Sequence, residues 1–198
     1  MKSSRILTSL SFIFLVACNT PVSKKLLVLG RGELTVKDNN IAMNDGSGYA
    51  EQTVDVTGDK AVTYNVTTPS GKTTVTIPEE KGFYLLNLKT DTVVGGQQFL
   101  GTNGSSRTIT QEQLKLNIDS LTKLTAGQNV SAAAHNYFVL PQQVIKVSEN
   151  MEAKVFGPFT KIPSTLEADK NGNTPEIYKF YTNTEMRQLI QNFKKMTY

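Results

Sequence analysis

The sequence contains one cysteine, one histidine and no tryptophan among its 198 residues. A single cysteine excludes a disulfide framework and a cysteine-rich metal site, because each of these needs at least two thiols. A single histidine excludes every motif that depends on a histidine pair. The sequence also has no apolar run of the ~20 residues that a helix needs to cross a bilayer. These absences exclude a polytopic helical membrane protein and most kinds of zinc site.

The remaining composition is that of a globular chain, with 38% hydrophobic and 19% charged residues. The formal net charge is +4, and two of the basic residues, Lys2 and Arg5, lie in a segment that we predict is removed. Without them, 21 basic residues fall to 19 against 17 acidic ones, which leaves +2. A charge this small does not favour a nucleic-acid partner.

The first residues have the pattern of a secretion signal. Lys2 and Arg5 precede an apolar run from Ile6 to Ala17, which only Thr8, Ser9 and Ser11 interrupt. A short apolar run after a basic start is typical of a signal peptide and is too short for a membrane span. We therefore predict that residues 1–17 are a signal peptide.

The end of this segment, Leu15-Val16-Ala17-Cys18, resembles the lipobox of bacterial lipoproteins, and the resemblance covers the first eighteen residues only. It implies cleavage between Ala17 and Cys18, and a diacylglycerol on the Cys18 sulfur with a further acyl chain on its amino group. Two or three acyl chains hold a protein on a membrane almost irreversibly. Asn19 in place of Asp favours the outer membrane of a Gram-negative bacterium. An ordinary signal peptide with an incidental cysteine is the alternative.

The mature chain begins with a predicted tether and a β-rich module. Residues 18–25 are read as the lipidated cysteine and a short polar tether, which can touch headgroups but is more simply solvated. From 26 to 100, apolar residues alternate with polar ones between turns at Gly58-Asp59 and Pro69-Ser70-Gly71. The alternation predicts an antiparallel meander over residues 53–77. The module resembles a small immunoglobulin-like or transthyretin-like sandwich.

A polar run at 101–106 is the predicted linker, and the pattern changes after it. Thr110 with Gln113 predicts a capped helix over 111–126, and Thr182 with Glu185 predicts a final helix. Short strands are predicted between them, at 137–140, 144–147 and 153–156. The expected fold class is α+β, with an antiparallel, sandwich-like N-terminal module followed by a mixed part, 107–198, with two helices and short strands.

Two glycine-rich segments look like nucleotide-binding motifs without having their full pattern. Ser70-Gly71-Lys72-Thr73 ends like a phosphate-binding loop, but Val66 stands where that motif needs glycine, and a strand is predicted to follow instead of a helix. Gly30-Arg31-Gly32 would need a third glycine at position 35, which is Thr35. We interpret the first segment as a hairpin and the second as a turn, and we predict no cofactor.

A calcium loop is a weaker hypothesis for residues 169–173. Asp169, Asn171 and Asn173 offer oxygen ligands of the kind that Ca²⁺ prefers. The spacing of the glycine and of Glu176 does not match that of an EF-hand. An Asn-Gly turn explains the segment better.

Catalytic constellations are equally incomplete. Ser131 and His135 would share a face if the segment were helical, but no Gly-x-Ser-x-Gly elbow surrounds the serine. Glu149 and Glu152 are a pair of carboxylates, although neighbouring glutamates are usually a solvated face. Tyr178 and Phe180 are read as core residues in preference to an aromatic binding strip.

Two functional classes are therefore open. The favoured one is a non-catalytic envelope lipoprotein, anchored through Cys18, that binds an envelope protein or a glycan. The alternative is a tethered hydrolase acting on envelope polymer or glycan, in which Ser131 and His135, or Glu149 and another carboxylate, would have to converge.

Overall fold

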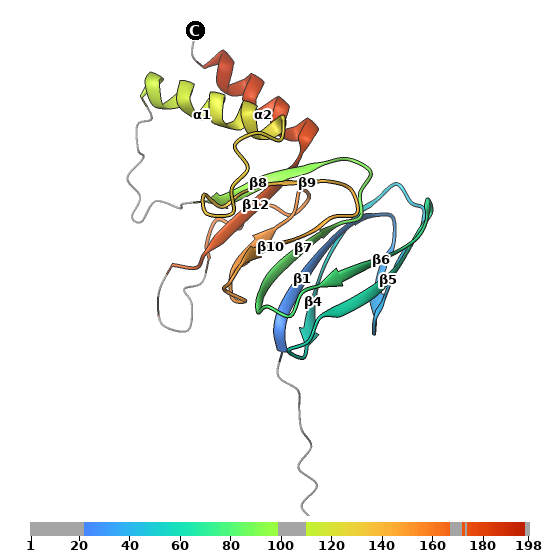
Figure 1. The fold of residues 1–198 in the computed structure, drawn as a ribbon. Coiled ribbons are helices and arrows are strands. Elements are labelled where there is room, and N and C mark those ends of the chain that lie inside the picture. The colour runs from blue at the N-terminus through green and yellow to red at the C-terminus, as the bar shows by residue number, and fades with distance from the viewer. Residues whose placement is uncertain (1–21, 99–109, 167–171, 173, 197–198) are drawn as a thin grey trace, which may run out of the picture.

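Three β-sheets and a pair of helices are stacked in layers (Figure 1). The computed structural model describes residues 22–98, 110–166, 172 and 174–196. Within this part of the chain there are twelve strands and two helices, so the fold class is α+β, as the sequence predicts. A separate apolar core fills each of the three spaces between neighbouring layers.

The central sheet is buried on both faces. Its order is β10-β7-β1-β4, and β1 runs parallel to β7 but antiparallel to β4. Side chains alternate along β1, so that Leu26 and Val28 enter one core while Leu27 and Leu29 enter the next. The strands are β1 (Val22–Arg31), β4 (Tyr49–Thr57), β7 (Gly82–Asn87) and β10 (Val144–Ser148).

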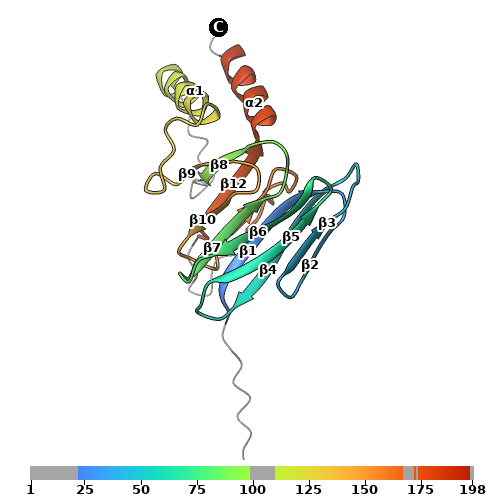
Figure 2. The same cartoon turned by 45° about the vertical axis from the view of Figure 1, so that its right-hand side comes forward.

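The second sheet covers one face of the central sheet, as Figure 2 shows from the side. Its order is β2-β3-β5-β6, and β3 is parallel to β5. Tyr64 and Val66 of β5 pack inward, whereas the intervening Asn65 is exposed. The strands are β2 (Leu34–Lys37), β3 (Asn40–Met43), β5 (Val62–Thr68) and β6 (Gly71–Ile77).

The meander predicted over residues 53–77 is wrong in its pairing. β5 and β6 form the expected hairpin, but β4 pairs with β1 in the central sheet and has no ladder with β5. The turn after β4 carries the chain from one sheet to the other. Alternation of apolar residues tells which face of a strand is buried, not which strand lies beside it.

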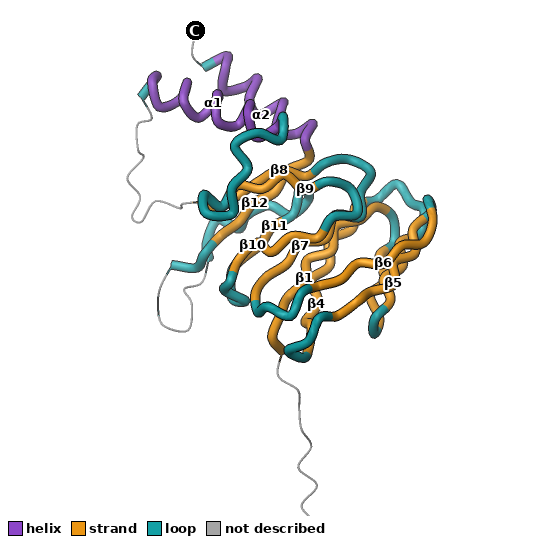
Figure 3. The backbone as a smooth tube through the Cα atoms, viewed as in Figure 1, coloured by secondary structure: helices purple, strands orange, loops and turns teal. Residues whose placement is uncertain are grey.

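The third sheet covers the other face of the central sheet and carries the helices on its outer side (Figure 3). Its order is β11-β12-β8-β9. Both helices begin with the predicted capping boxes, at Thr110 with Gln113 and at Thr182 with Glu185. The elements are β8 (Val93–Gln98), β9 (Asn136–Val139), β11 (Lys154–Phe156), β12 (Ile177–Thr182), α1 (Gln111–Thr125) and α2 (Asn183–Lys195).

Strands from both sides of the predicted linker share sheets. β7 pairs with β10, and β8 pairs with β9 and β12. The linker range itself lies outside the described residues. β1 begins at Val22, so residues 22–25 belong to a strand and not to the predicted tether. Lys24 is fully buried, and its Nζ donates to the carbonyls of Lys60 at 2.6 Å and Gly58 at 3.1 Å.

Candidate ligand-binding site

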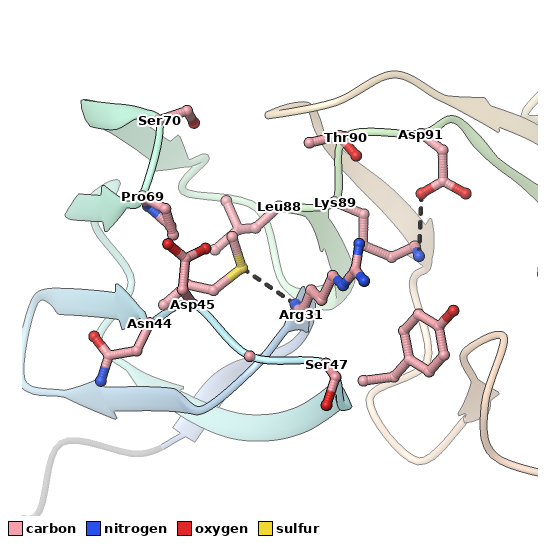
Figure 4. A pocket seen from close by; sticks show the side chains of 13 residues that line it. Arg31, Asn44, Asp45, Ser47, Pro69, Ser70, Leu88, Lys89, Thr90 and Asp91 are labelled. Carbon is pink, nitrogen blue, oxygen red and sulfur yellow. Dashed lines mark hydrogen bonds and ion pairs between the residues drawn. The ribbon is translucent and has the colours of Figure 1, made fainter.

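A cavity of about 570 Å³ opens at one end of the central and second sheets (Figure 4). Parallel strands have their carboxyl ends at the same edge, and the parallel pair of each of these two sheets, β1 with β7 and β3 with β5, ends at this cavity. Its walls are the ends of these strands and the loops that follow them. The lining residues are Arg31, Met43, Asn44, Asp45, Gly46, Ser47, Tyr49, Pro69, Ser70, Leu88, Lys89, Thr90 and Asp91.

The loop between β3 and β4 is held close to the end of β1 by glycines. The Gly32 N–H donates to the Gly48 carbonyl at 2.7 Å. Gly32 has a φ of +77°, and a Cβ on it would lie 2.1 Å from the Asn44 carbonyl oxygen. A side chain at position 32 would therefore push the loop away and displace Asp45 and Ser47 from the cavity wall.

An aromatic pair forms one side of the cavity. The rings of Tyr49 and Phe159 are stacked with centroids 3.8 Å apart and planes at 10°. Tyr49 lines the cavity and Phe159 does not, so Phe159 supports the ring from behind. Tyr49 is 59% exposed, which is unusual for a large aromatic side chain in a structured position.

Lys89 is buried beside this stack. Its Nζ is 5.1 Å from the Tyr49 centroid and 4.8 Å from the Phe159 centroid, and it forms an ion pair with Asp91 at 3.0 Å. Because Nζ is almost equidistant from two rings that are stacked on each other, it lies at their rims and not over either face. The lysine therefore fixes the edge of the stack and leaves the second face of Tyr49 free.

The loop that carries Phe159 is fastened from two sheets. Glu51 of β4 accepts hydrogen bonds from the Phe159 N–H at 2.6 Å and from the Thr160 hydroxyl at 2.5 Å. Lys179 of β12 donates from its buried Nζ to the carbonyls of Gly157, Pro158 and Thr160. Burial lowers the pKa of Lys179, although Glu51 and Glu185 oppose this effect. The position of Phe159 is thus fixed before any ligand arrives.

Two charged groups on the cavity wall have no side-chain partner within the described part of the chain. The Arg31 guanidinium and the Asp45 carboxylate are exposed and make no hydrogen bond or ion pair there. The Arg31 backbone N–H donates to the Met43 sulfur at 3.2 Å, and this bond leaves the guanidinium uninvolved. Both groups are therefore available to a ligand.

This site is not predicted from the sequence. The segments at 30–32 and 69–71 are predicted as turns, and no sequence pattern singles out Tyr49, Lys89 or Phe159. The turns are real, and the useful signal was that several polar, glycine-rich turns follow buried strands. A single sequence does not show that these turns meet.

Ser131 and His135 are not brought together as a nucleophile and base. The segment between them forms turns, not a helix, and Ser131 makes an isolated β-bridge with Asn136. The Ser131 hydroxyl oxygen accepts from the Ala134 N–H at 3.3 Å. His135 instead has its Nδ1 2.9 Å from the Tyr178 hydroxyl.

Glu149 and Glu152, the predicted carboxylate pair, bind different lysines. Glu149 accepts from Lys146 Nζ at 2.8 Å, while Glu152 lies 3.9 Å from Lys25. Burial would lower the pKa of Lys146, but hydrogen bonds to Glu149 and Glu80 outweigh burial and raise it. These glutamates are partners of surface lysines.

A polar chain that the sequence analysis missed surrounds Tyr178. Tyr178 and Phe180 are fully buried, which confirms that they are core residues. The Tyr178 hydroxyl donates to Glu176, whose other oxygen accepts from Ser148 at 2.8 Å. Burial and the bond to Glu176 raise the pKa of Tyr178. The chain joins β10, β12 and the turn that precedes β9, and none of its residues lines the cavity.

Several predicted residues lie outside the described part of the chain, namely Ala17, Cys18, Asp169, Asn171 and Asn173. Among the described residues, no group of three or more histidine, cysteine or acidic side chains is placed to hold a metal ion. No helix in the same part of the chain is both long and apolar enough to cross a bilayer.

Comparison with known proteins gives no relative. No protein-family model matches the chain, and no curated protein or solved structure is significantly similar to it.

Proposed function

We propose that this protein is a lipid-anchored, non-catalytic binding module of a bacterial cell envelope. Acyl chains on Cys18 hold it on a membrane, and Asn19 in place of Asp favours the outer membrane. The cavity at the end of β1 binds a protein segment or a glycan of the envelope. The observation that carries this proposal is the exposed ring of Tyr49, which stacks on Phe159 in a loop that Glu51 and Lys179 hold in place.

The position of the cavity supports a role away from the anchor. Arg31 is the last residue of β1 and Val22 is the first, so the strand separates them by roughly 30 Å. Only three residues stand between Cys18 and Val22, and a chain of this length spans at most about 14 Å. The cavity therefore lies at the end of β1 that is distant from the lipid, where envelope polymers and proteins are within reach.

The first test concerns the anchor. Cells that produce the protein are labelled with an alkyne fatty acid, and the protein is examined for label and for removal of residues 1–17. We expect label on the wild type and none on Cys18→Ala, which should also remain unprocessed, because the lipobox offers no other thiol. Label that persists in Cys18→Ala would contradict the anchor.

The second test concerns the cavity. A photo-crosslinking amino acid replaces Ser47 on the cavity wall or, as a control, the exposed Leu116 on α1. After irradiation of intact cells, we expect the mature, lipidated protein with the crosslinker at position 47 to form a discrete adduct. The protein with the crosslinker at position 116 should form no adduct of the same mass. Identical adduct patterns at both positions, or no adduct at position 47, would contradict binding in the cavity.

A further inference from the structure

We infer that the ligand of this cavity is a glycan bearing an uncharged sugar ring, which stacks on the free face of Tyr49. This inference rests on the proposed function and names the class of ligand for the same site. The C–H groups on one face of a pyranose form an apolar patch that packs on an aromatic ring, while its hydroxyl groups point outward at the edges. A binding site for such a ring needs a flat aromatic surface surrounded by both donors and acceptors.

The flat surface is present and is rigid. Phe159 covers one face of Tyr49, and Lys89 lies at the rim, so the second face is open to the cavity. Glu51 and Lys179 hold the Phe159 loop from opposite sides, so that little side-chain freedom remains to be lost on binding. An exposed aromatic ring that is fixed in advance contributes contact area at a low entropic cost.

The charges around the ring favour an uncharged ligand. Two cations, Arg31 and Lys89, are matched by two anions, Asp45 and Asp91, so the wall has no net charge. Lys89 and Asp91 already neutralise each other at 3.0 Å. An anionic ligand would meet Asp45 and a cationic ligand would meet Arg31. A hydroxyl group both donates and accepts, so an uncharged sugar can bond to either residue without bringing a like charge up to it.

The size of the cavity agrees with a short stretch of glycan. Its volume of about 570 Å³ lies within the ~300 to 1,000 Å³ of sites that enclose a small molecule. Such a volume is too small for a folded protein partner. A peptide that binds by strand addition needs an exposed sheet edge, whereas this cavity is lined by loops and strand ends.

The experiment measures binding of defined oligosaccharides to the full-length, detergent-solubilised protein by calorimetry and by NMR. The uncharged probes are the tetramers of chitin, cellulose, starch and mannan, and the charged probe is tetragalacturonate. We expect at least one uncharged probe to bind with a Kd of about 1 mM or tighter. Tyr49→Ala should weaken that binding about tenfold or more, because the stacking surface is lost. Tyr49→Trp should retain it.

Matched variants separate stacking from general damage. Leu116→Ala removes another exposed apolar side chain, and Arg187→Met removes an exposed arginine on α2. Neither should change the Kd, whereas Arg31→Met should weaken binding severalfold. Tyr49 is mostly exposed, so Tyr49→Ala should lose only the contribution of the ring stack and still unfold in one cooperative transition, and its loss of binding is then not a loss of folding.

Other outcomes overturn the inference in distinct ways. Tighter binding of tetragalacturonate than of every uncharged probe would show that the ligand is anionic. An adduct at position 47 that consists of protein, together with no binding of any sugar up to about 10 mM, would show a protein ligand and leave the proposed function standing. The absence of any specific adduct at position 47 would instead contradict the proposed function itself.

Discussion

Replacing Lys179 by methionine removes the charge that fastens the Phe159 loop and keeps most of the volume of the side chain. The Lys179 Nζ donates to the carbonyls of Gly157 at 2.5 Å, Thr160 at 2.9 Å and Pro158 at 3.3 Å. Thr160 is exposed, so water can replace its bond in the variant. Gly157 and Pro158 are buried, and their carbonyls lose the lysine donor.

The magnitude follows from these two buried groups. A buried carbonyl without a donor costs about 1 to 3 kcal/mol, and the longer bond to Pro158 belongs at the low end. Burial lowers the pKa of Lys179, so methionine recovers part of this loss by avoiding a buried charge. We expect a net loss of about 2 to 3 kcal/mol. For a chain of this length, that corresponds to a fall of about 4 to 12 °C in Tm.

Thermal unfolding of the full chain in detergent measures the change, with Lys161→Met as the control. Lys161 is an exposed lysine in the same loop region, and its replacement should shift stability by less than about 0.5 kcal/mol. Nuclear Overhauser contacts between the rings of Tyr49 and Phe159 report the second effect, because the loop should lose its fixed position. If Lys179→Met kept both the wild-type Tm and these ring contacts, the reasoning would be refuted.

Three further predictions concern the rest of the fold. Deleting residues 184–198 should leave an aggregated or degraded protein, because Met186 and Ile190 bury against α1 at about 1.5 to 3 kcal/mol per side chain; an unchanged, cooperative melt would contradict this. The pKa of Tyr178 is raised in the folded state, whereas the unfolded side chain ionises near 10.0, so this residue stabilises the fold below pH 10 and loses that effect as the pH rises further. Denaturant titrations of Tyr178→Phe at increasing alkaline pH should therefore show a shallower loss of stability than the wild type, and equal slopes would count against the assignment. His135→Ala should complement a deletion strain as well as the wild type does, because the half-buried His135 ring contacts the Tyr178 hydroxyl and not a nucleophile. If the variant fails to complement although its protein level and lipid labelling are normal, the hydrolase alternative is favoured.

The elements that the sequence predicted correctly are those with local signals. Both helices begin at the threonines of their capping boxes, and all the atoms of such a box lie within four consecutive residues. The hairpin of β5 and β6 was equally clear from its turn.

The pairing of the strands could not be predicted in the same way. β1 pairs with β7 across more than fifty residues of sequence, and the intervening strands lie partly in another sheet. The alternation in β4 is compatible with pairing to β1 as well as with pairing to β5, because the pattern shows only which face of the strand each side chain lies on. Lys24 was predicted to lie in a solvated tether, because the backbone carbonyls that bind its Nζ lie far along the sequence, at positions 58 and 60.

The candidate site depends on the same kind of distant contact. Tyr49, at the start of β4, stacks on Phe159, which lies in a loop far along the chain. Glu51 and Lys179 bind that loop from two different sheets. Each residue alone has an ordinary explanation as a surface aromatic, an acidic strand residue or a lysine in a strand. Only the arrangement in space makes them a site.

Hydrogen exchange on the protein in its native membranes tests the central claim most directly. Amide exchange of the mature, lipidated protein is compared between native envelope membranes and detergent. We predict slower exchange in the envelope for two of the segments that line the cavity, 44–49 and 88–91, with no change for the exposed face of α1. Equal exchange of these loops in both conditions would contradict a ligand in the cavity.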